Sequence, residues 1–509
     1  MLFFRKPIEH ESIVKALKKN APLTELEYYA LELKAWKHSP ERMEQIDGDR
    51  YYSGDHDILQ RVRTAIGNDG DLVPVPNLPN NRIIDNQYAK HVDQKKNYLF
   101  SQPISFDCEN KTYADKLSKV LGKKFMRSLK NAGCESLNGG ISWLYPYYDK
   151  NGDLAFRVFP GYEIKPFWND SAHTDLDMAL RLYPVEVYIG TTKKVIEKCD
   201  IFKLEGVTTY IYAGGRLLED PTAEHTGSDS YITVTDNKGQ VKQFNWERIP
   251  LIPIKCNAKE IPLIRRARQL QDAINTIMSD FVNNMQEDIR NTILVLKNYD
   301  GTDLGEFRKN LMTYGAIKVR SVEGQQGGVD TLTIEVNADN YKTVLECLKK
   351  ALIENMRSYD AKDDRMSNNP NQMNIQSMYA DIDLDANDME TELQAAFEDI
   401  LWFVNTHLAN TGDGNFQNED VNVIFNRDIL INESEAIDNC QKSVGIISNE
   451  TIVGMHPWVD DPAKELDRLD EEQAEANASD PYRTAFETGQ SNTDPLLDTT
   501  GGDPVNAEE

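Results

Sequence analysis

The sequence predicts an α+β protein that is mainly helical. Three observations support this fold class. Apolar residues repeat with helical spacing over two long stretches, 261–289 and from Ile375 to about Leu408. The first half holds β-branched and aromatic runs interrupted by Asn-Gly and Gly-Gly, and a group of short strand-like segments separates two of the predicted long helices. A chain of 509 residues is expected to form about two to four structural units.

The first 259 residues are expected to form one mixed region. Helical apolar spacing predicts a helix over 23–40 that Pro40 ends, and a second helix is expected after Asp55. The segments 141–160 and 202–218 are typical of hairpins, because their strand-like runs flank Asn-Gly and Gly-Gly turns.

Residues 261–289 predict the longest element of the middle region, a helix on the order of 40 Å. One near-heptad stripe of this helix must pack against another long element, and it comprises Leu263, Ala267, Leu270, Ile274, Ile277, Phe281 and Met285. Strands are expected at 292–297, 316–321 and 328–336, around a short helix at 303–312. A second long helix over 338–357 then places this small α/β insert at the tip of a helical pair.

The stretch DIDLDANDMETE, residues 381–392, matches a calcium loop at its liganding positions Asp381, Asp383, Asp385 and Glu392. Ala386 stands where the loop needs glycine, and Asp388 occupies a place where an apolar residue is expected. The preceding segment 358–374 is polar and contains Pro370, which predicts a loop, and a helix is expected from Ile375. We therefore favour a helical interpretation, in which the acids lie in the first turns and meet the positive end of the helix dipole.

The last hundred residues predict a helical end followed by a charged tail. Residues 421–426 are strand-like, and 433–453 predict a helix, a turn and the start of another helix. From Asp460 to Glu509 there are fifteen acids and three bases, and apolar residues become scarce after Ala478, so the end is expected to be disordered.

Composition and motifs argue against several functional classes. The net charge of -27 opposes a basic surface that grips nucleic acid. The six cysteines form no C-x-x-C pair, so neither a zinc site nor a disulfide framework is expected, and no apolar run approaches the roughly 20 residues of a membrane span. No phosphate-binding loop occurs, and GGISW fails as a nucleophile elbow because Leu144 follows it in place of glycine. His56 and Asp57 are expected to begin a capped helix, so we expect no catalytic residue, cofactor or metal and no enzyme.

Four segments and their order carry a resemblance to a known family: YYSGDHDIL at 51–59, PNNRIIDNQYAKHVDQKKNYLFSQPISF at 79–106, QLQDAINTIMSDFVNN at 269–284, and GIISNETIVGMHPWVDDPAKELDRLDEE at 445–472. Together with the series helix, α/β insert, helix, loop, helix, they resemble the portal proteins of tailed bacteriophages, especially the type found in long-tailed phages of Gram-positive hosts.

This resemblance implies a domain for each part of the chain. The portal fold would comprise a wing at 1–259, stem helices at 260–290 and 338–357, a clip at 291–337, a tunnel loop at 358–374, a long wing or bridging helix at 375–410, a crown at 411–476 and a disordered acidic tail at 477–509. It would assemble as a homo-oligomeric ring, usually of twelve subunits, at one vertex of the capsid.

The resemblance also implies a function and partners. Double-stranded DNA would pass through the ring without sequence specificity, driven in by the terminase motor and later ejected. The expected partners are the terminase large subunit, a head-completion or connector protein, and the major capsid and scaffolding proteins, with no membrane; the ring would be assembled in the host cytoplasm and end in the virion. Docking of the motor and connector is expected on the clip at Asp303, Glu306, Arg308 and Lys309.

The acidic composition suits such a channel, because an acidic wall repels phosphates and lets DNA slide. A few residues of the tunnel loop are expected to touch the DNA backbone: Lys362, Arg365, Asn368, Asn369 and Asn371. The alternative is a cytosolic helical scaffold or adaptor, which would also be acidic and rich in long helices. A portal protein and a scaffold protein differ in assembly, because the subunits of a portal must form a closed, cyclic head-to-tail ring.

Overall fold

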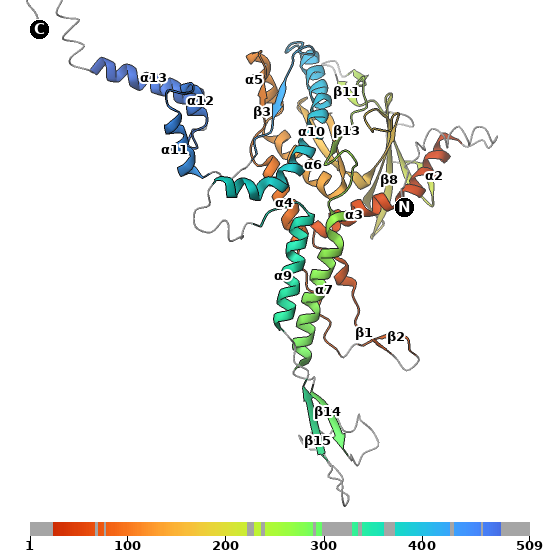
Figure 1. Ribbon diagram of the computed structural model, residues 1–509. Coiled ribbons are helices and arrows are strands. Elements are labelled where there is room, and N and C mark those ends of the chain that lie inside the picture. The colour runs from red at the N-terminus through yellow and green to blue at the C-terminus, as the bar shows by residue number, and fades with distance from the viewer. Residues whose placement is uncertain are drawn as a thin grey trace, which may run out of the picture. The chain divides into compact units, whose positions relative to one another are not determined.

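The computed structural model describes residues 24–66, 70–75, 78–220, 229–235, 240–288, 292–297, 328–333, 338–360, 372–427, 432–459 and 462–479 (Figure 1). The chain divides into two compact units. The first comprises Met1–Asp360 and Met378–Ile429, and the second comprises Ala361–Ser377 and Leu430–Glu509. Helices and antiparallel strands both occur, as the sequence predicts.

The first unit begins with two helices, α2 (Glu25–Lys37) and α3 (Pro40–Tyr52). The Thr24 side chain caps α2 in a capping box with Glu27, and Ser39 caps α3, whose first residue is Pro40. The helix expected after Asp55 was wrong, because Asp57–Gln60 forms only a single 3-10 turn, η1. Pro40 therefore lies between two helices and begins the second. Proline suits the first helical position because it has no N–H that would be left unpaired there.

Two antiparallel sheets form the β part of this unit. The larger has the order β10-β9-β8-β7-β6, with strands Arg216–Glu219, Gly206–Ala213, Thr192–Lys203, Leu176–Ile189 and Ile164–Trp168. The smaller has the order β13-β4-β5, with strands Ile252–Lys255, Ile141–Tyr148 and Leu154–Pro160. The hairpins predicted at 141–160 and 202–218 are present as β4–β5 and β9–β10. Gly152 in the first hairpin turn and Gly214–Gly215 in the second adopt positive φ, as such turns require.

Helices cover these sheets. Apolar residues of α2, including Leu33, pack with Leu180 and Ile201 of the larger sheet in one core cluster. The helices α4 (Gln87–Phe100), α5 (Lys111–Val120) and α6 (Lys123–Gly139) contribute to the main core together with the smaller sheet. Short pairs complete the β structure: β1 (Thr64–Ile66) with β2 (Leu72–Pro74), β11 (Ile232–Thr235) with β12 (Val241–Phe244), and β3 (Ser105–Asp107) with β16 (Asn422–Ile424).

A pair of long helices, α7 (Ile264–Asp288) and α9 (Ala338–Asn355), runs side by side away from the sheets (Figure 1). Between them in the chain, β14 (Thr292–Lys297) pairs antiparallel with β15 (Gly328–Thr333). The long helices expected at 261–289 and 338–357 and the strand at 292–297 are therefore present, and the strand expected at 328–336 is present over 328–333, its last three residues lying outside the described residues. The helix expected at 303–312 and the strand at 316–321 lie outside the described residues.

The helix α10 (Gln372–Thr411) is the longest in the described chain, and its first six residues belong to the second unit. Its predicted apolar positions are buried at Ile382, Leu393 and Phe397, among others. The second unit also contains α11 (Glu433–Ser443), α12 (Asn449–Gly454) and α13 (Pro462–Ser479), which match the helices expected in 433–453 and extend beyond them. The tail beyond residue 479 lies outside the described residues.

None of the described helices combines the length and apolar character that crossing a membrane requires. All six cysteines are free, and Cys199, Cys256 and Cys440 are buried. Cys347 on α9 is exposed.

Candidate functional site along the α7–α9 helix pair

A row of uncharged polar side chains is buried along α7. Its members follow one another every four residues and so lie on one face of the helix. They are Gln271, Asn275, Ser279 and Asn283, which are at most 1% exposed. We call this row the polar ladder.

The polar ladder binds the backbone of residues 81–88, which runs in the opposite direction to α7. The N–H groups of four residues donate to the side-chain oxygens of the ladder: Asn81 to Asn283 Oδ1 at 2.8 Å, Ile83 to Ser279 Oγ at 2.9 Å, Asp85 to Asn275 Oδ1 at 3.0 Å, and Tyr88 to Gln271 Oε1 at 2.9 Å. Because this segment leads into the first turn of α4 and lacks sheet partners, α7 supplies the acceptors that its backbone needs. The ladder therefore fixes residues 81–88 against the helix pair.

His56 joins the polar ladder as a neutral side chain. Its Nε2 lies 3.0 Å from the Tyr51 carbonyl oxygen and donates to it, so its Nδ1 accepts from Asn275 Nδ2 at 2.9 Å. Burial lowers the pKa of His56 below its usual value. Its neighbour Asp57 instead pairs with Arg50 at 2.7 Å and Arg268 at 2.9 Å. These separate contacts agree with a structural role at the start of η1.

The apolar stripe of α7 behaves differently along its length. Leu263, Ala267 and Ile274 are buried, Leu270, Ile277 and Phe281 are half-buried, and Met285 is 54% exposed. The Phe281 ring lies 5.0 Å from the Tyr341 ring of α9, and Asn284 Nδ2 donates to the Tyr341 hydroxyl at 2.9 Å. Packing of the helix pair is thus tightest at the end nearest the sheets.

Four charged side chains meet at this end of the pair. Asp385 of α10 forms ion pairs with Lys95 of α4 at 2.8 Å, with Arg266 of α7 at 3.0 Å and with Arg357, just beyond α9, at 2.9 Å. Lys95 also donates to the Arg357 carbonyl oxygen at 2.9 Å. We call Lys95, Arg266, Arg357 and Asp385 the charge cluster.

Burial alone would raise the pKa of Asp385, but Lys95 and the two arginines outweigh it and hold this pKa below its ordinary value. The same burial lowers the pKa of Lys95, against the attraction of Asp385. Lys95 and Asp385 depend on one another, because removing either would leave the other as a buried charge without this partner.

Aromatic and polar contacts extend the charge cluster. Tyr379 of α10 stacks on Tyr98 of α4, with ring centroids 5.5 Å apart, and packs against Tyr359 at 4.7 Å. Asp383 accepts from the Tyr98 hydroxyl and pairs with Arg427 at 2.9 Å. The chain is therefore held at Arg357–Tyr359 and again at 379–385, before and after the polar segment 361–371.

The calcium-loop match at 381–392 is helical throughout, as we favoured, and lies within α10. The expected reason for its acids was wrong, however, because α10 begins at Gln372 and Asp381 lies beyond the first turn. Asp383 and Asp385 are instead stabilised by cations from distant parts of the chain. Within the described part of the chain, no three His, Cys, Asp or Glu side chains are grouped so as to hold a metal ion.

The expected DNA-contacting and docking residues lie outside the described residues. These are Lys362, Arg365, Asn368, Asn369 and Asn371, and Asp303, Glu306, Arg308 and Lys309. Sequence reasoning did not identify the polar ladder or the charge cluster. The spacing of four residues along α7 was the available signal for the ladder, whereas the partners of Asp385 are too far apart in sequence to suggest a cluster.

Residues 33–479 match the family described as phage portal protein, SPP1 Gp6-like. The chain belongs to this family. The portal protein of Bacillus phage SPP1 is 29% identical over 439 residues, which cover 86% of this chain and 84% of that protein. The portal protein of Clostridium phage phiCD119 is 28% identical over 449 residues, which cover 86% of this chain and 94% of that protein.

A solved chain from the neck of a native GTA particle, computed with C12 symmetry, is 11% identical and covers 72% of this chain and 88% of its own. Its TM-score of 0.35 is too low to support a conclusion. The family resemblance drawn from the sequence is confirmed by the family match and both curated relatives, and nothing in these comparisons supports a cytosolic scaffold or adaptor. As a phage portal protein, the chain is a structural component of the phage particle.

Proposed function

We propose that this portal protein closes into a ring, usually of twelve subunits, at one capsid vertex, and that double-stranded DNA passes through the ring during packaging and ejection. The family match over residues 33–479 is the observation that carries the proposal. In this assembly the terminase motor and the head-completion protein attach to the ring, which contacts the major capsid and scaffolding proteins. Assembly takes place in the host cytoplasm.

The charge of the chain supports a conduit. With a net charge of -27 per subunit, a ring of copies repels phosphates over most of its surface. A duplex would therefore stay away from the wall and slide, whereas a lumen with many cations would hold it through salt-dependent phosphate contacts.

The charge cluster supports a specific role for the segment between α9 and α10. Lys95 and Asp385 tie the end of α9 to α10, so described residues are held on both sides of the segment 361–371. A polar segment that is held on both sides can contact DNA without moving the long helices of the stem. We propose that Lys362 and Arg365, helped by Asn368, Asn369 and Asn371, form weak contacts with the DNA backbone that break as DNA moves.

The test compares a Lys362→Glu/Arg365→Glu variant with a control variant, Lys150→Glu/Lys194→Glu, which changes the charge equally at two exposed positions elsewhere. Sedimentation and negative-stain imaging in excess chelator should show rings for the wild type and both variants. Packaged DNA should be shorter, or less well retained, only in the Lys362/Arg365 variant. Absence of rings from the wild type would overturn the portal ring, and full packaging by the Lys362/Arg365 variant would overturn the loop contact alone.

A further inference from the structure

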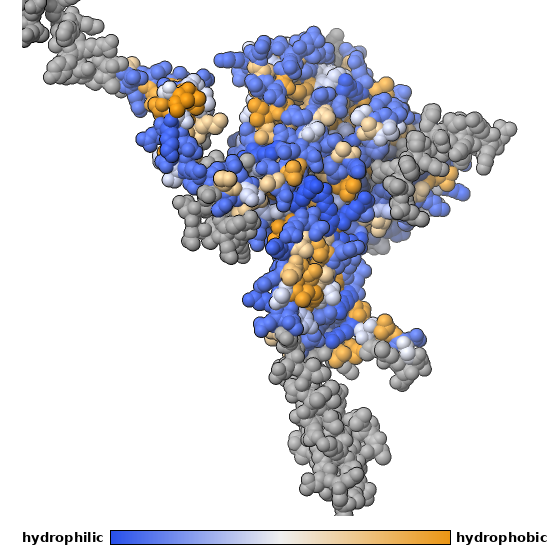
Figure 2. Space-filling view, in the orientation of Figure 1, coloured by the Kyte–Doolittle hydropathy of each residue, from blue (hydrophilic) through white to orange (hydrophobic). Residues whose placement is uncertain are grey.

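The β1–β2 hairpin lies to one side of α7 (Figure 1), and apolar side chains are exposed there (Figure 2). Leu72 is 69% exposed and Val73 is 45% exposed, and Val62, which leads into the hairpin, is 55% exposed. Within the described positions 64–66 and 70–75, Asp71 is the one charged residue. Two-stranded hairpins are at best marginally stable alone, so this one needs a further surface against which to pack.

The base of the hairpin is firmly attached to the helix pair. Arg61 forms an ion pair with Asp280 of α7 at 2.9 Å, and Arg63 donates to the Pro79 carbonyl oxygen at 2.9 Å. Asn80 donates to the Arg61 carbonyl oxygen at 3.1 Å, which ties the incoming and outgoing chains together. The next residue, Asn81, is the first that the polar ladder binds. The hairpin is therefore presented from one side of α7 in a fixed position.

On α9, one flank carries no charge along the whole helix. Its positions follow one another at intervals of three or four residues and so share a side. They are Asn340, Val344, Cys347, Ala351 and Asn355. Val344 is 47% exposed and Cys347 is exposed, although apolar and thiol side chains are usually buried. We call this surface the uncharged flank.

The uncharged flank points away from the hairpin. Lys349 of α9 forms an ion pair at 2.6 Å with Asp85, so the side of α9 near Lys349 faces the segment 81–88, which follows the hairpin in the chain. Cys347 precedes Lys349 by two residues and is about 200° away around the helix. The hairpin and the uncharged flank therefore lie on opposite sides of the helix pair.

We propose that the β1–β2 hairpin of one subunit packs on the uncharged flank of α9 in the neighbouring subunit. The inference rests on the proposed ring. In a cyclic head-to-tail assembly, each subunit must present two different complementary surfaces on opposite sides. The hairpin and the flank meet this requirement, because both are poor in charge and both expose apolar residues. Burying Val344 together with Leu72 or Val73, whichever side of β2 faces the flank, removes apolar surface from water on both partners.

The exposed thiol of Cys347 allows a direct test. The variants Leu72→Cys and Val73→Cys place a thiol on each face of β2, because successive strand residues point to opposite faces. Assembled protein is oxidised mildly with diamide and separated on a denaturing gel without reductant. A disulfide between subunits gives a series of covalent oligomers up to the ring, whereas a disulfide within one chain leaves the monomer mass unchanged.

We expect this series for at least one of the two variants. It should disappear when Cys347→Ser is added, and it should be absent from the control Leu218→Cys, whose position on β10 is 49% exposed. Rings that assemble normally but give no covalent oligomers with either variant, or oligomers that persist after Cys347→Ser, would overturn the hairpin contact and leave the portal ring intact. A wild-type protein that forms no ring would overturn both.

Discussion

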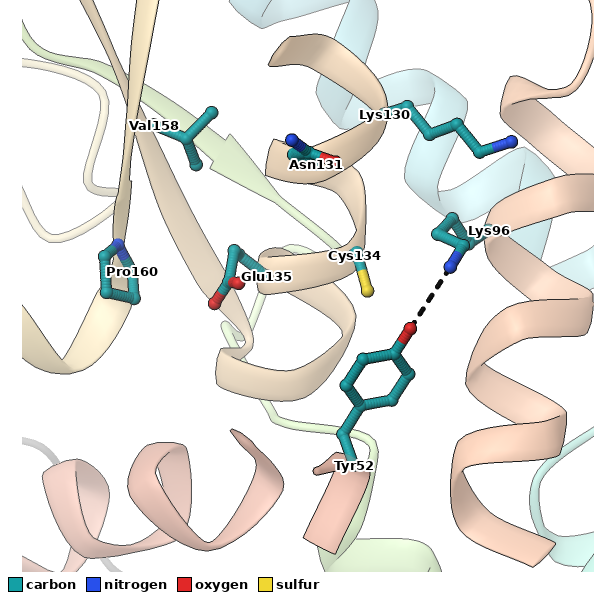
Figure 3. A pocket seen from close by; sticks show the side chains of 8 residues that line it. All are labelled: Tyr52, Lys96, Lys130, Asn131, Cys134, Glu135, Val158 and Pro160. Carbon is teal, nitrogen blue, oxygen red and sulfur yellow. Dashed lines mark hydrogen bonds between the residues drawn. The ribbon is translucent and has the colours of Figure 1, made fainter. Parts of the chain in front are cut away.

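Two half-buried carboxyl groups, Asp385 on α10 and Glu135 on α6, have pKa values shifted in opposite directions. Asp385 is surrounded by the three cations of the charge cluster, which hold its pKa below the ordinary value. Glu135 lines a cavity of about 370 Å³ together with Tyr52, Lys96, Lys130, Asn131, Cys134, Val158 and Pro160 (Figure 3). Burial, with Asp49 and Glu163 nearby, raises the pKa of Glu135 to about 7.

The difference comes from what each neighbouring cation binds. Lys95 lies next to Asp385, which is the one carboxylate in the charge cluster. The Lys95 ammonium group is therefore directed at Asp385 and neutralises it. In the cavity, Lys96 is engaged by Asp93 at 2.5 Å and by the Tyr52 hydroxyl at 3.2 Å. Burial therefore destabilises the charge on Glu135 without compensation. Location near a lysine is not enough; the ammonium must be directed at the carboxylate.

The largest expected loss of unfolding free energy comes from changing Asp385, the carboxyl group that has paired charges. Asp385→Ala removes the carboxylate that neutralises Lys95, whose side chain is only 5% exposed. Breaking such a pair from one side costs about 3–5 kcal/mol, because the remaining charge is buried. Urea unfolding should show this loss of unfolding free energy. The control is Asp381→Ala, an exposed acid on the same helix, which should change it by about 0.5 kcal/mol or less; equal effects of the two changes would contradict the role of the cluster.

The polar ladder gives an intermediate case, because its members have partners but no full charge. Asn275→Leu leaves the Asp85 N–H without its acceptor and His56 without its donor. Each buried group left unsatisfied costs about 1–3 kcal/mol. The matched control is Gln269→Leu, at an exposed position of α7. The same urea measurement should separate the two variants clearly, and equal stabilities would mean that water replaces the ladder's hydrogen bonds.

The elements that the sequence predicts well are those whose apolar stripes pack along their whole length, such as α10. Helix α3 was missed because its residues, PERMEQIDGDRYY, show almost no apolar period. Its buried face includes Asp47 and Gly48. At Gly48 the backbone of α3 approaches α6 so closely that a Cβ would lie 2.0 Å from the Asn138 carbonyl oxygen. Close approach of two helices, rather than hydrophobicity, buries this face, and single-sequence periodicity does not detect that.

The candidate site was harder to predict than the helices that form it. A polar residue at every fourth position normally marks an exposed face, so Gln271 and Asn275 gave no sign of burial. Their partners lie about 190 residues away and are mostly backbone N–H groups, which every sequence has. Asp385 was noticed for the wrong reason, as part of a calcium-like pattern. Its actual partners come from α4, α7 and the end of α9, and only the fold brings them together.

The smallest expected effect is at Glu135, and its sign depends on pH. Below the ordinary pKa of 4.5, the carboxyl is protonated in the folded and unfolded states alike. Between 4.5 and about 7 the folded protein keeps a proton that the unfolded chain has released, so its stability falls as pH rises through this interval. Above about 7 the buried carboxylate is charged and the whole penalty is present.

Glu135→Gln keeps the shape of the side chain and removes the charge, so it should stabilise the protein at pH 8 and have little effect at pH 4.5. Because Glu135 is only half-buried, solvent screening limits the gain to the order of 1 kcal/mol. Thermal unfolding at both pH values, with Glu109→Gln as an exposed control, measures the difference. A gain that is equal at the two pH values would show that the glutamine packs better, and would remove the contrast between Glu135 and Asp385.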